Sequence, residues 1–122
     1  MTTQTITLPM PPSLNNAFSQ TRAGRRFPSS RYKRWRAMAY LSIKAARLVP
    51  VAGPAEVCIT LHAKDRRRRD ADNLIKPVVD SLVATGVLAD DDSRHVRTVS
   101  ATWAAPDRIN PRAVVVISPW KS

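Results

Sequence analysis

Acidic and basic side chains that could act on a phosphodiester are concentrated in the segment DRRRRDADNLIK, residues 65–76. Asp70 and Asp72 are two residues apart, and in an extended backbone side chains at this spacing point to the same side. The two carboxylates could then share one cation, and carboxylate oxygens suit Mg²⁺ or Mn²⁺. Lys76 follows Asp72 by four residues, so on a helix it would share a face with Asp72 and could stabilise charge at a phosphate.

A second acidic group, Asp90-Asp91-Asp92, follows after one expected helix and a turn. If this loop returns to segment 65–76, it brings a third carboxylate to the same place. A metal ion held there would activate water and stabilise the leaving oxygen in phosphodiester hydrolysis. Each feature also has a purely structural interpretation, because Asp72 or Asn73 can cap a helix, Asp70 gains from the helix dipole, and aspartates are common in turns.

The apolar pattern of the rest of the chain predicts the elements that would position these residues. Polar and apolar residues alternate in residues 4–8 and 56–63, residues 113–117 are apolar and β-branched, and apolar residues recur at helical spacing in the helices. The expected order is strand 4–8, a helix capped by Ser29 or Ser30 that runs to about residue 48, strand 56–63, helix 73–85 followed by Gly86, strand 96–103 and strand 113–117. The fold class is therefore α+β, a single domain over residues 1–122 in which two main helices pack against a small mixed sheet.

Three local features of the sequence make further predictions. Segment 19–28 is polar and basic and contains Gly24 and Pro28, which predicts a mobile basic loop. Pro77 removes a backbone donor near the first turn of helix 73–85, which is tolerable if the helix starts late or bends there. His62 and His95 have no carboxylate at a telling spacing, so we expect them to be surface residues on strands.

The charge of the chain points to a polyanionic partner. Lys and Arg number 20 against 9 Asp and Glu, which gives a formal net charge of +11. The first 55 residues contain nine basic side chains and no acid, whereas seven of the nine acids lie between Asp65 and Asp92. A basic surface attracts nucleic acid, and acids gathered in one window act against that attraction unless they have another use, such as binding a metal.

Several classes of protein are excluded by what the sequence lacks. No apolar run approaches the roughly 20 residues of a membrane span, so no membrane association is expected. The N-terminal residues do not resemble a signal peptide, so a cytoplasmic protein is expected. A single cysteine, Cys58, excludes an intrachain disulfide and a cysteine-rich zinc site. The three glycines form no phosphate-binding loop, so no nucleotide cofactor is expected.

Two segments resemble the RusA family of Holliday-junction resolvases, small endodeoxyribonucleases of bacteria and their prophages. The main match is DRRRRDADNLIKPVVDSLVATGVLADD, residues 65–91, and the shorter one is ITLPMPPSLNNAF, residues 6–18. The resemblance implies an α+β homodimer, encoded by a bacterium or phage, that binds four-way DNA junctions and nicks two opposing strands in a Mg²⁺-dependent reaction, with Mn²⁺ able to substitute.

Carried over residue by residue, the resemblance implies roles for the acidic and basic side chains described above. The metal ligands fall on Asp70, Asp72 and one residue of the acidic loop, for which Asp91 is chosen over Asp90 and Asp92 from its spacing to Gly86. The catalytic lysine falls on Lys76. The DNA-contacting residues fall on Asn73 and on the basic run Arg66, Arg67, Arg68 and Arg69, while Arg25 and Arg26 are expected to contact DNA from their charge alone.

Two other functions are compatible with the charge. A non-catalytic basic DNA-binding protein of prophage origin would use the same surface but would give no special role to Asp70. An RNA-binding or ribosome-associated protein would explain the basic residues but not the acidic window. The acidic residues and Lys76 favour the nuclease over both.

Overall fold

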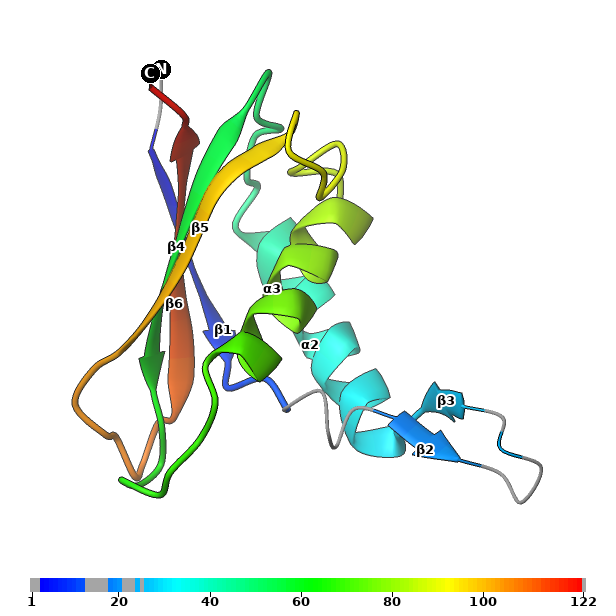
Figure 1. Ribbon diagram of the computed structural model, residues 1–122, viewed down its shortest axis with the longest axis vertical. Helices are drawn as coiled ribbons and strands as arrows, with labels where there is room; N and C mark the ends of the chain where they lie inside the picture. The colour runs from blue at the N-terminus through cyan, green and yellow to red at the C-terminus, as the bar shows by residue number, and fades with distance from the viewer. Residues whose placement is uncertain (1–2, 13–17, 21–23, 25, 122) are drawn as a thin grey trace.

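Alternating apolar residues build a four-stranded sheet at the centre of the molecule. The computed structural model describes residues 3–12, 18–20, 24 and 26–121, and its elements are labelled as in Figure 1. The sheet has the order β1-β6-β4-β5. Its strands are β1 (Gln4–Pro9), β4 (Ala55–His62), β5 (Val96–Trp103) and β6 (Arg112–Pro119). The pairs β1–β6 and β6–β4 are antiparallel and β4–β5 is parallel, so the expected mixed sheet is confirmed.

Two helices cover one face of this sheet, and Figure 1 shows both on the same side of it. These are α2 (Ser30–Ala45) and α3 (Asp72–Ala84). In β4, alternate residues from Ala55 to Leu61 are buried, and the residues between them are only half-buried. The α+β class predicted from the sequence is therefore confirmed, with the helices in one layer and the sheet in the other.

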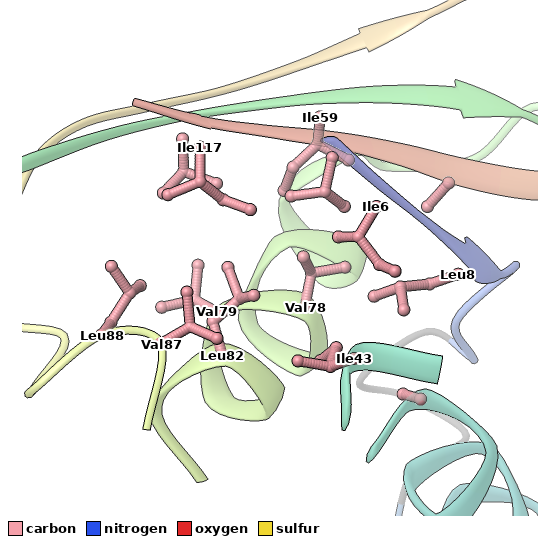
Figure 2. Close-up of a cluster of buried hydrophobic side chains, with 14 of the residues drawn as sticks. Ile6, Leu8, Ile43, Ile59, Val78, Val79, Leu82, Val87, Leu88 and Ile117 are labelled. Atoms are coloured by element: carbon pink, nitrogen blue, oxygen red, sulfur yellow. The ribbon is translucent and has the colours of Figure 1, made fainter. Parts of the chain in front are cut away.

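The core lies between these two layers. Figure 2 shows Ile6, Ile59 and Ile117 of the sheet pointing toward Val78 and Leu82 of α3. The two α3 side chains and Ile117 are fully buried, and the other two residues are at most 8% exposed. Because α3 contributes this broad apolar face to the core, its polar face, which contains Asp72 and Lys76, is directed away from the sheet.

Helix α2 ends earlier than the sequence predicts. The expected end is near residue 48, but the last helical residue is Ala45 and the C-cap is Ala46. Arg47 has a φ of +53°, in the left-handed region, which stops the helix. At the other end, the Ser29 side chain accepts a hydrogen bond from the Tyr32 backbone N–H at 3.2 Å, so the predicted serine cap is confirmed.

The prediction of a mobile loop over residues 19–28 is wrong for the part of it that the structure describes. A short antiparallel ladder joins β2 (Phe18–Gln20) to β3 (Arg26–Pro28). Gly24 and Pro28 argue against regular structure in the sequence, but a hairpin needs a turn residue between its strands, and proline is tolerated at the end of an edge strand. Arg25 lies outside the described residues.

Pro77 does not delay the start of α3. The helix begins at Asp72, so Pro77 lies inside it, beyond its first turn. Its ring is fully buried, and this burial of apolar surface offsets the loss of one backbone donor. None of the helices in the described part of the chain is long and apolar enough to cross a membrane.

Candidate active site

The loop between β4 and α3 is held in shape by one arginine and one aspartate. We call residues 65–69 the arginine loop. The Asp65 carboxylate accepts hydrogen bonds from the Arg67 backbone N–H at 3.0 Å and from the Arg69 guanidinium at 2.7 Å. Arg69 also donates to the backbone carbonyls of Asp65 and Arg67. The bond from the Arg67 backbone, followed by the one from Arg69, lowers the pKa of Asp65. Arg66, Arg67 and Arg68 remain exposed.

Asp70 and Asp72 do not point to the same side. The residue between them, Ala71, has φ −61° and ψ −36°, which is helical rather than extended backbone. In a helical backbone, side chains two residues apart do not face each other, so the argument from an extended strand is wrong at this position. Neither Asp72 nor Asn73 caps α3, because the N-cap is Ala71 and makes no side-chain hydrogen bond. The structural interpretation of Asp72 as a helix cap is therefore also wrong.

Lys76 stands between two carboxylates from different parts of the chain. Its Nζ is 3.4 Å from Asp80 Oδ1, one turn further along α3, and 4.0 Å from Asp91 Oδ2 in the acidic loop. The side chains of Lys76, Asp80 and Asp91 are 57%, 41% and 49% exposed, so all three are open to a ligand. The acidic loop thus lies beside Lys76, as predicted. Asp80 also lies beside Lys76, and its position four residues after Lys76 on the helix could have been noticed in the sequence.

The three aspartates of the acidic loop, Asp90–Asp92, have different surroundings. Asp92 accepts hydrogen bonds from the Arg94 guanidinium at 2.9 Å and pairs with His95 Nδ1 at 2.7 Å. These two side chains, Arg94 first, lower the pKa of Asp92 to about 2. Asp90 Oδ1 accepts a hydrogen bond from the Asp91 backbone N–H. Asp91 is the one that faces Lys76, which favours it over its neighbours as the functional residue. The expectation that His95 lacks a carboxylate partner is wrong.

The carboxylates are available to a cation but are not gathered at one point. Among the residues that the structure describes, no three acidic, histidine or cysteine side chains lie close enough together to hold a metal ion. Within that same part of the chain, neither the Asp70 nor the Asp72 carboxylate has a hydrogen bond or ion pair, and both residues are exposed. Mg²⁺ commonly uses one or two protein carboxylates and takes its other ligands from phosphate and water. The donor set therefore fits a magnesium ion that arrives with a phosphate-bearing substrate.

A large basic cleft adjoins the start of α3, with a volume of about 840 Å³. Its lining contains five cationic side chains and, as its one carboxylate among the described residues, Asp70. The lining is Pro9, Met10, Pro11, Pro12, Arg31, Ala63, Lys64, Arg67, Arg68, Arg69, Asp70, Asn73, Leu74 and Pro111. Asp70 and Asn73 thus line this basic cleft. Asp72 does not line it, and lies one helical turn before Lys76 on the same face of α3 as that residue.

Two cationic residues of the basic cleft, Arg31 and Lys64, were missed by the sequence analysis. Arg31 lies in the first turn of α2 beside other basic residues, and nothing in its spacing separates it from Lys33 or Arg34. On the other side of the arginine loop, a smaller hollow of about 300 Å³ includes Trp103, which is 38% exposed. Of the two basic residues expected to contact DNA from charge alone, Arg26 lies in β3 and Arg25 falls outside the described residues.

Comparison with known proteins identifies the family to which this arrangement belongs. The family described as endodeoxyribonuclease RusA matches residues 9–118, which include the basic cleft, Lys76 and the acidic loop. The chain belongs to the RusA family. The "Crossover junction endodeoxyribonuclease RusA" of Escherichia coli (strain K12) is 41% identical over 92 residues, which cover 75% of this chain and 76% of that protein.

Two further relatives show the same similarity. The protein of that name from Shigella sonnei (strain Ss046) is 41% identical over 92 residues, and that of Enterobacteria phage 82 is 40% identical over 92 residues. Both alignments cover 75% of this chain and 76% of the relative. The family expected from segments 65–91 and 6–18 is therefore confirmed, and with it the prediction that the chain is an endodeoxyribonuclease.

Proposed function

We propose that this protein resolves four-way DNA junctions by paired, metal-dependent nicks in opposing strands. The relatives named above are crossover junction endodeoxyribonucleases, and the proposal extends that substrate to this chain. The observation that carries it is the position of Asp91, which reaches from the acidic loop to within 4.0 Å of Lys76 on α3. A protein that only bound DNA would gain nothing from an exposed carboxylate at this place.

The three aspartates Asp70, Asp72 and Asp91 are the ligands we assign to Mg²⁺, or to Mn²⁺ in its place. Their oxygens are hard donors, and the carboxylates of Asp70 and Asp72 are not engaged by other groups in the described residues. When bound, the metal would supply Lewis acidity and an activated water for phosphodiester hydrolysis. Because the three carboxylates are not gathered at one point, the start of α3 and the acidic loop would have to draw together to hold the metal, and a DNA phosphate and water would supply its other ligands.

Lys76 is the residue we assign to charge stabilisation at the phosphate. Its side chain is 57% exposed, and its Nζ is 3.4 Å from Asp80 and 4.0 Å from Asp91, so these two carboxylates hold it only weakly. Exposed ion pairs of this kind are weak, which leaves Lys76 able to turn toward a substrate oxygen. Loss of one group that stabilises a developing oxyanion typically slows the reaction by about 10²- to 10³-fold.

The basic side chains at the start of α3 are the DNA contacts in this proposal. Arg66, Arg67 and Arg68 are exposed on the arginine loop, Arg69 is held by Asp65, and Asn73 lines the basic cleft. Arg25 and Arg26 are included as DNA contacts from their charge alone. Contacts to phosphates position the DNA and make its binding weaken with salt. Two symmetric nicks in one junction require two sites related by a twofold axis, so we also propose a homodimer.

A cleavage assay tests this function directly. Purified protein is incubated with a synthetic immobile four-way junction or a linear duplex of matched sequence, with Mg²⁺ or with EDTA, and the products are resolved on a denaturing gel. Paired, symmetric nicks in the junction alone, and only with Mg²⁺, are expected. Tight, salt-sensitive binding without cleavage on several junction sequences, with Mn²⁺ also tried, would overturn the proposal in favour of a non-catalytic DNA-binding protein.

A further inference from the structure

The basic cleft contains two cations that the proposed reaction does not use. Arg31 from α2 and Lys64 from the end of β4 face the same cleft as Arg67, Arg68 and Arg69. Arg31 and Lys64 are exposed and make no ion pair within the described residues. Against these five positive charges the cleft presents one carboxylate, Asp70, so it is suited to an anion. The anion would lie directly beside one of the proposed metal ligands.

Both walls of the basic cleft are held in place by hydrogen bonds. On one wall, Trp35 donates its Nε1–H to the Pro9 carbonyl at 2.8 Å, which ties the segment Pro9–Pro12 to α2. Trp35 is only 5% exposed, so this anchor is part of the core. On the other wall, Asp65 fixes Arg69 at 2.7 Å. A cleft whose walls are fixed before binding loses less conformational freedom when a ligand enters.

The chemistry of the two walls differs, and the difference indicates the ligand. The apolar part of the lining consists of the half-buried Pro9, Met10 and Pro111 and of the buried Pro11, Pro12 and Leu74. The other part of the lining is cationic, and Asn73 adds a carboxamide to it. A volume of about 840 Å³ lies within the range of sites that hold a small molecule, so the cleft has room for a group the size of one nucleotide. A single nucleotide has a flat apolar base and anionic phosphates and so matches both walls.

We propose that the basic cleft receives one unstacked nucleotide of the cleaved strand at the point of strand exchange. Its base lies against Pro9 and Met10, Asn73 contacts the base edge, and Arg31 and Lys64 bind the flanking phosphates. A branch point favours this ligand because unstacking costs least where regular stacking is already interrupted. The inference rests on the proposed function, since it assumes that a DNA junction is the substrate, and it adds a subsite with two further DNA-binding residues.

The test uses the full-length protein with both cleft cations removed, as Arg31→Ala/Lys64→Ala. The matched control is Lys44→Ala/Lys121→Ala, which removes two exposed charges that do not line the basic cleft. Junctions carry the fluorescent base 2-aminopurine at single positions around the crossover, with EDTA to prevent cleavage. Its emission rises when the base leaves the stack, and affinity is measured in the same titrations at several salt concentrations.

Saturating wild-type protein is expected to raise the emission at one position beside the crossover. The control variant keeps this rise, whereas the cleft variant loses most of it even at saturation. Each phosphate contact on a single strand contributes about 0.7 to the slope of log K against log salt, so the loss of two contacts weakens binding by about 25-fold at roughly 0.1 M salt.

An equal rise in emission with both double variants would overturn the inference. So would a wild-type protein that binds and cuts the junction without unstacking a base at any position. In these two cases the proposed function stands and the subsite fails. A wild-type protein that neither prefers nor cuts junctions would remove the proposed function itself, and the subsite with it.

Discussion

Replacing Lys76 with methionine separates a catalytic role for this residue from a structural one. Methionine keeps the length of the apolar stem and removes the charge. The two ion pairs lost, at 3.4 Å and 4.0 Å, join side chains that are 41–57% exposed. Exposed pairs contribute about 0.2–1 kcal/mol each and often less, so Lys76→Met is expected to lower stability by less than about 1 kcal/mol. In a domain of this size that corresponds to a fall in Tm of at most about 4 °C.

The effect on cleavage is expected to be much larger. Loss of one charge-stabilising group typically lowers kcat by about 10²- to 10³-fold. Single-turnover cleavage of a four-way junction gives the rate, and thermal unfolding followed by circular dichroism gives Tm. Lys33→Met, which removes an exposed charge from α2, is the control and should change neither quantity. Cleavage by Lys76→Met at the wild-type rate would refute the assignment, and a fall in Tm of about 10 °C or more would show that Lys76 is needed for the fold.

Three further predictions concern the elements that position the site. Gly86 has a φ of +82°, and a methyl group added at its Cα would meet nothing within 4 Å. Gly86→Ala should therefore cost only backbone strain, about 1–2 kcal/mol, which corresponds to a fall in Tm of about 4–8 °C. An unchanged Tm would contradict this. Trp35→Phe removes the hydrogen bond to the Pro9 carbonyl and should destabilise the protein by about 1–3 kcal/mol in denaturant unfolding. A loss below about 0.5 kcal/mol, which is the size of the effect of a neutral surface substitution, would show that this hydrogen bond is unimportant. The pKa of Asp92 is lowered from 3.8 to about 2, so its stabilising interactions are present above about pH 4 and are lost as the pH falls toward 2. The difference in unfolding free energy between wild type and Asp92→Asn should therefore shrink over that range. A constant difference would argue against the pairing of Asp92 with Arg94 and His95.

The elements that face the core could be predicted because their apolar residues recur at the spacing of a strand or a helix. The alternation in residues 56–63 corresponds to β4, displaced by one residue, and residues 96–103 form the expected strand β5 although most of them are exposed. Gly86 was expected just past helix 73–85. Its N–H donates a hydrogen bond to the Val83 carbonyl, and the Val87 N–H donates one to the Leu82 carbonyl, which is the usual pattern at the end of a helix terminated by glycine. These features depend on local sequence, so they need no knowledge of the tertiary structure.

Features that depend on pairing between segments were less accessible. The β2–β3 ladder has three residues on each strand, too few for an alternating pattern to emerge. The direction in which Asp70 points depends on the helical conformation of Ala71, which its residue type does not determine. Asp91 could be chosen among the three aspartates only from a resemblance. The structure adds a physical reason, since Asp92 is engaged by Arg94 and His95 whereas Asp91 faces Lys76.

The basic cleft could not be predicted at all from the order of residues. Its walls come from the end of β1, the start of α2, the arginine loop and the start of α3, which are separated in sequence and are brought together by the sheet (Figure 1). Arg31 is one of nine basic residues in the first 55, and it lines the basic cleft only because α2 docks on β1. The charge of the chain predicted a nucleic-acid partner but not which basic side chains would contact it.

The most direct test of the account is the Asp72→Asn variant, measured for both junction binding and junction cleavage. Asp72 is exposed and makes no hydrogen bond or ion pair in the described part of the chain, so the fold should not change. If Asp72 is a metal ligand, junction affinity in EDTA should stay within about twofold of the wild-type value while Mg²⁺-dependent cleavage is abolished. Glu56→Gln, on the face of the sheet away from the helices, should change neither. Cleavage by Asp72→Asn at the wild-type rate would contradict the proposed active site.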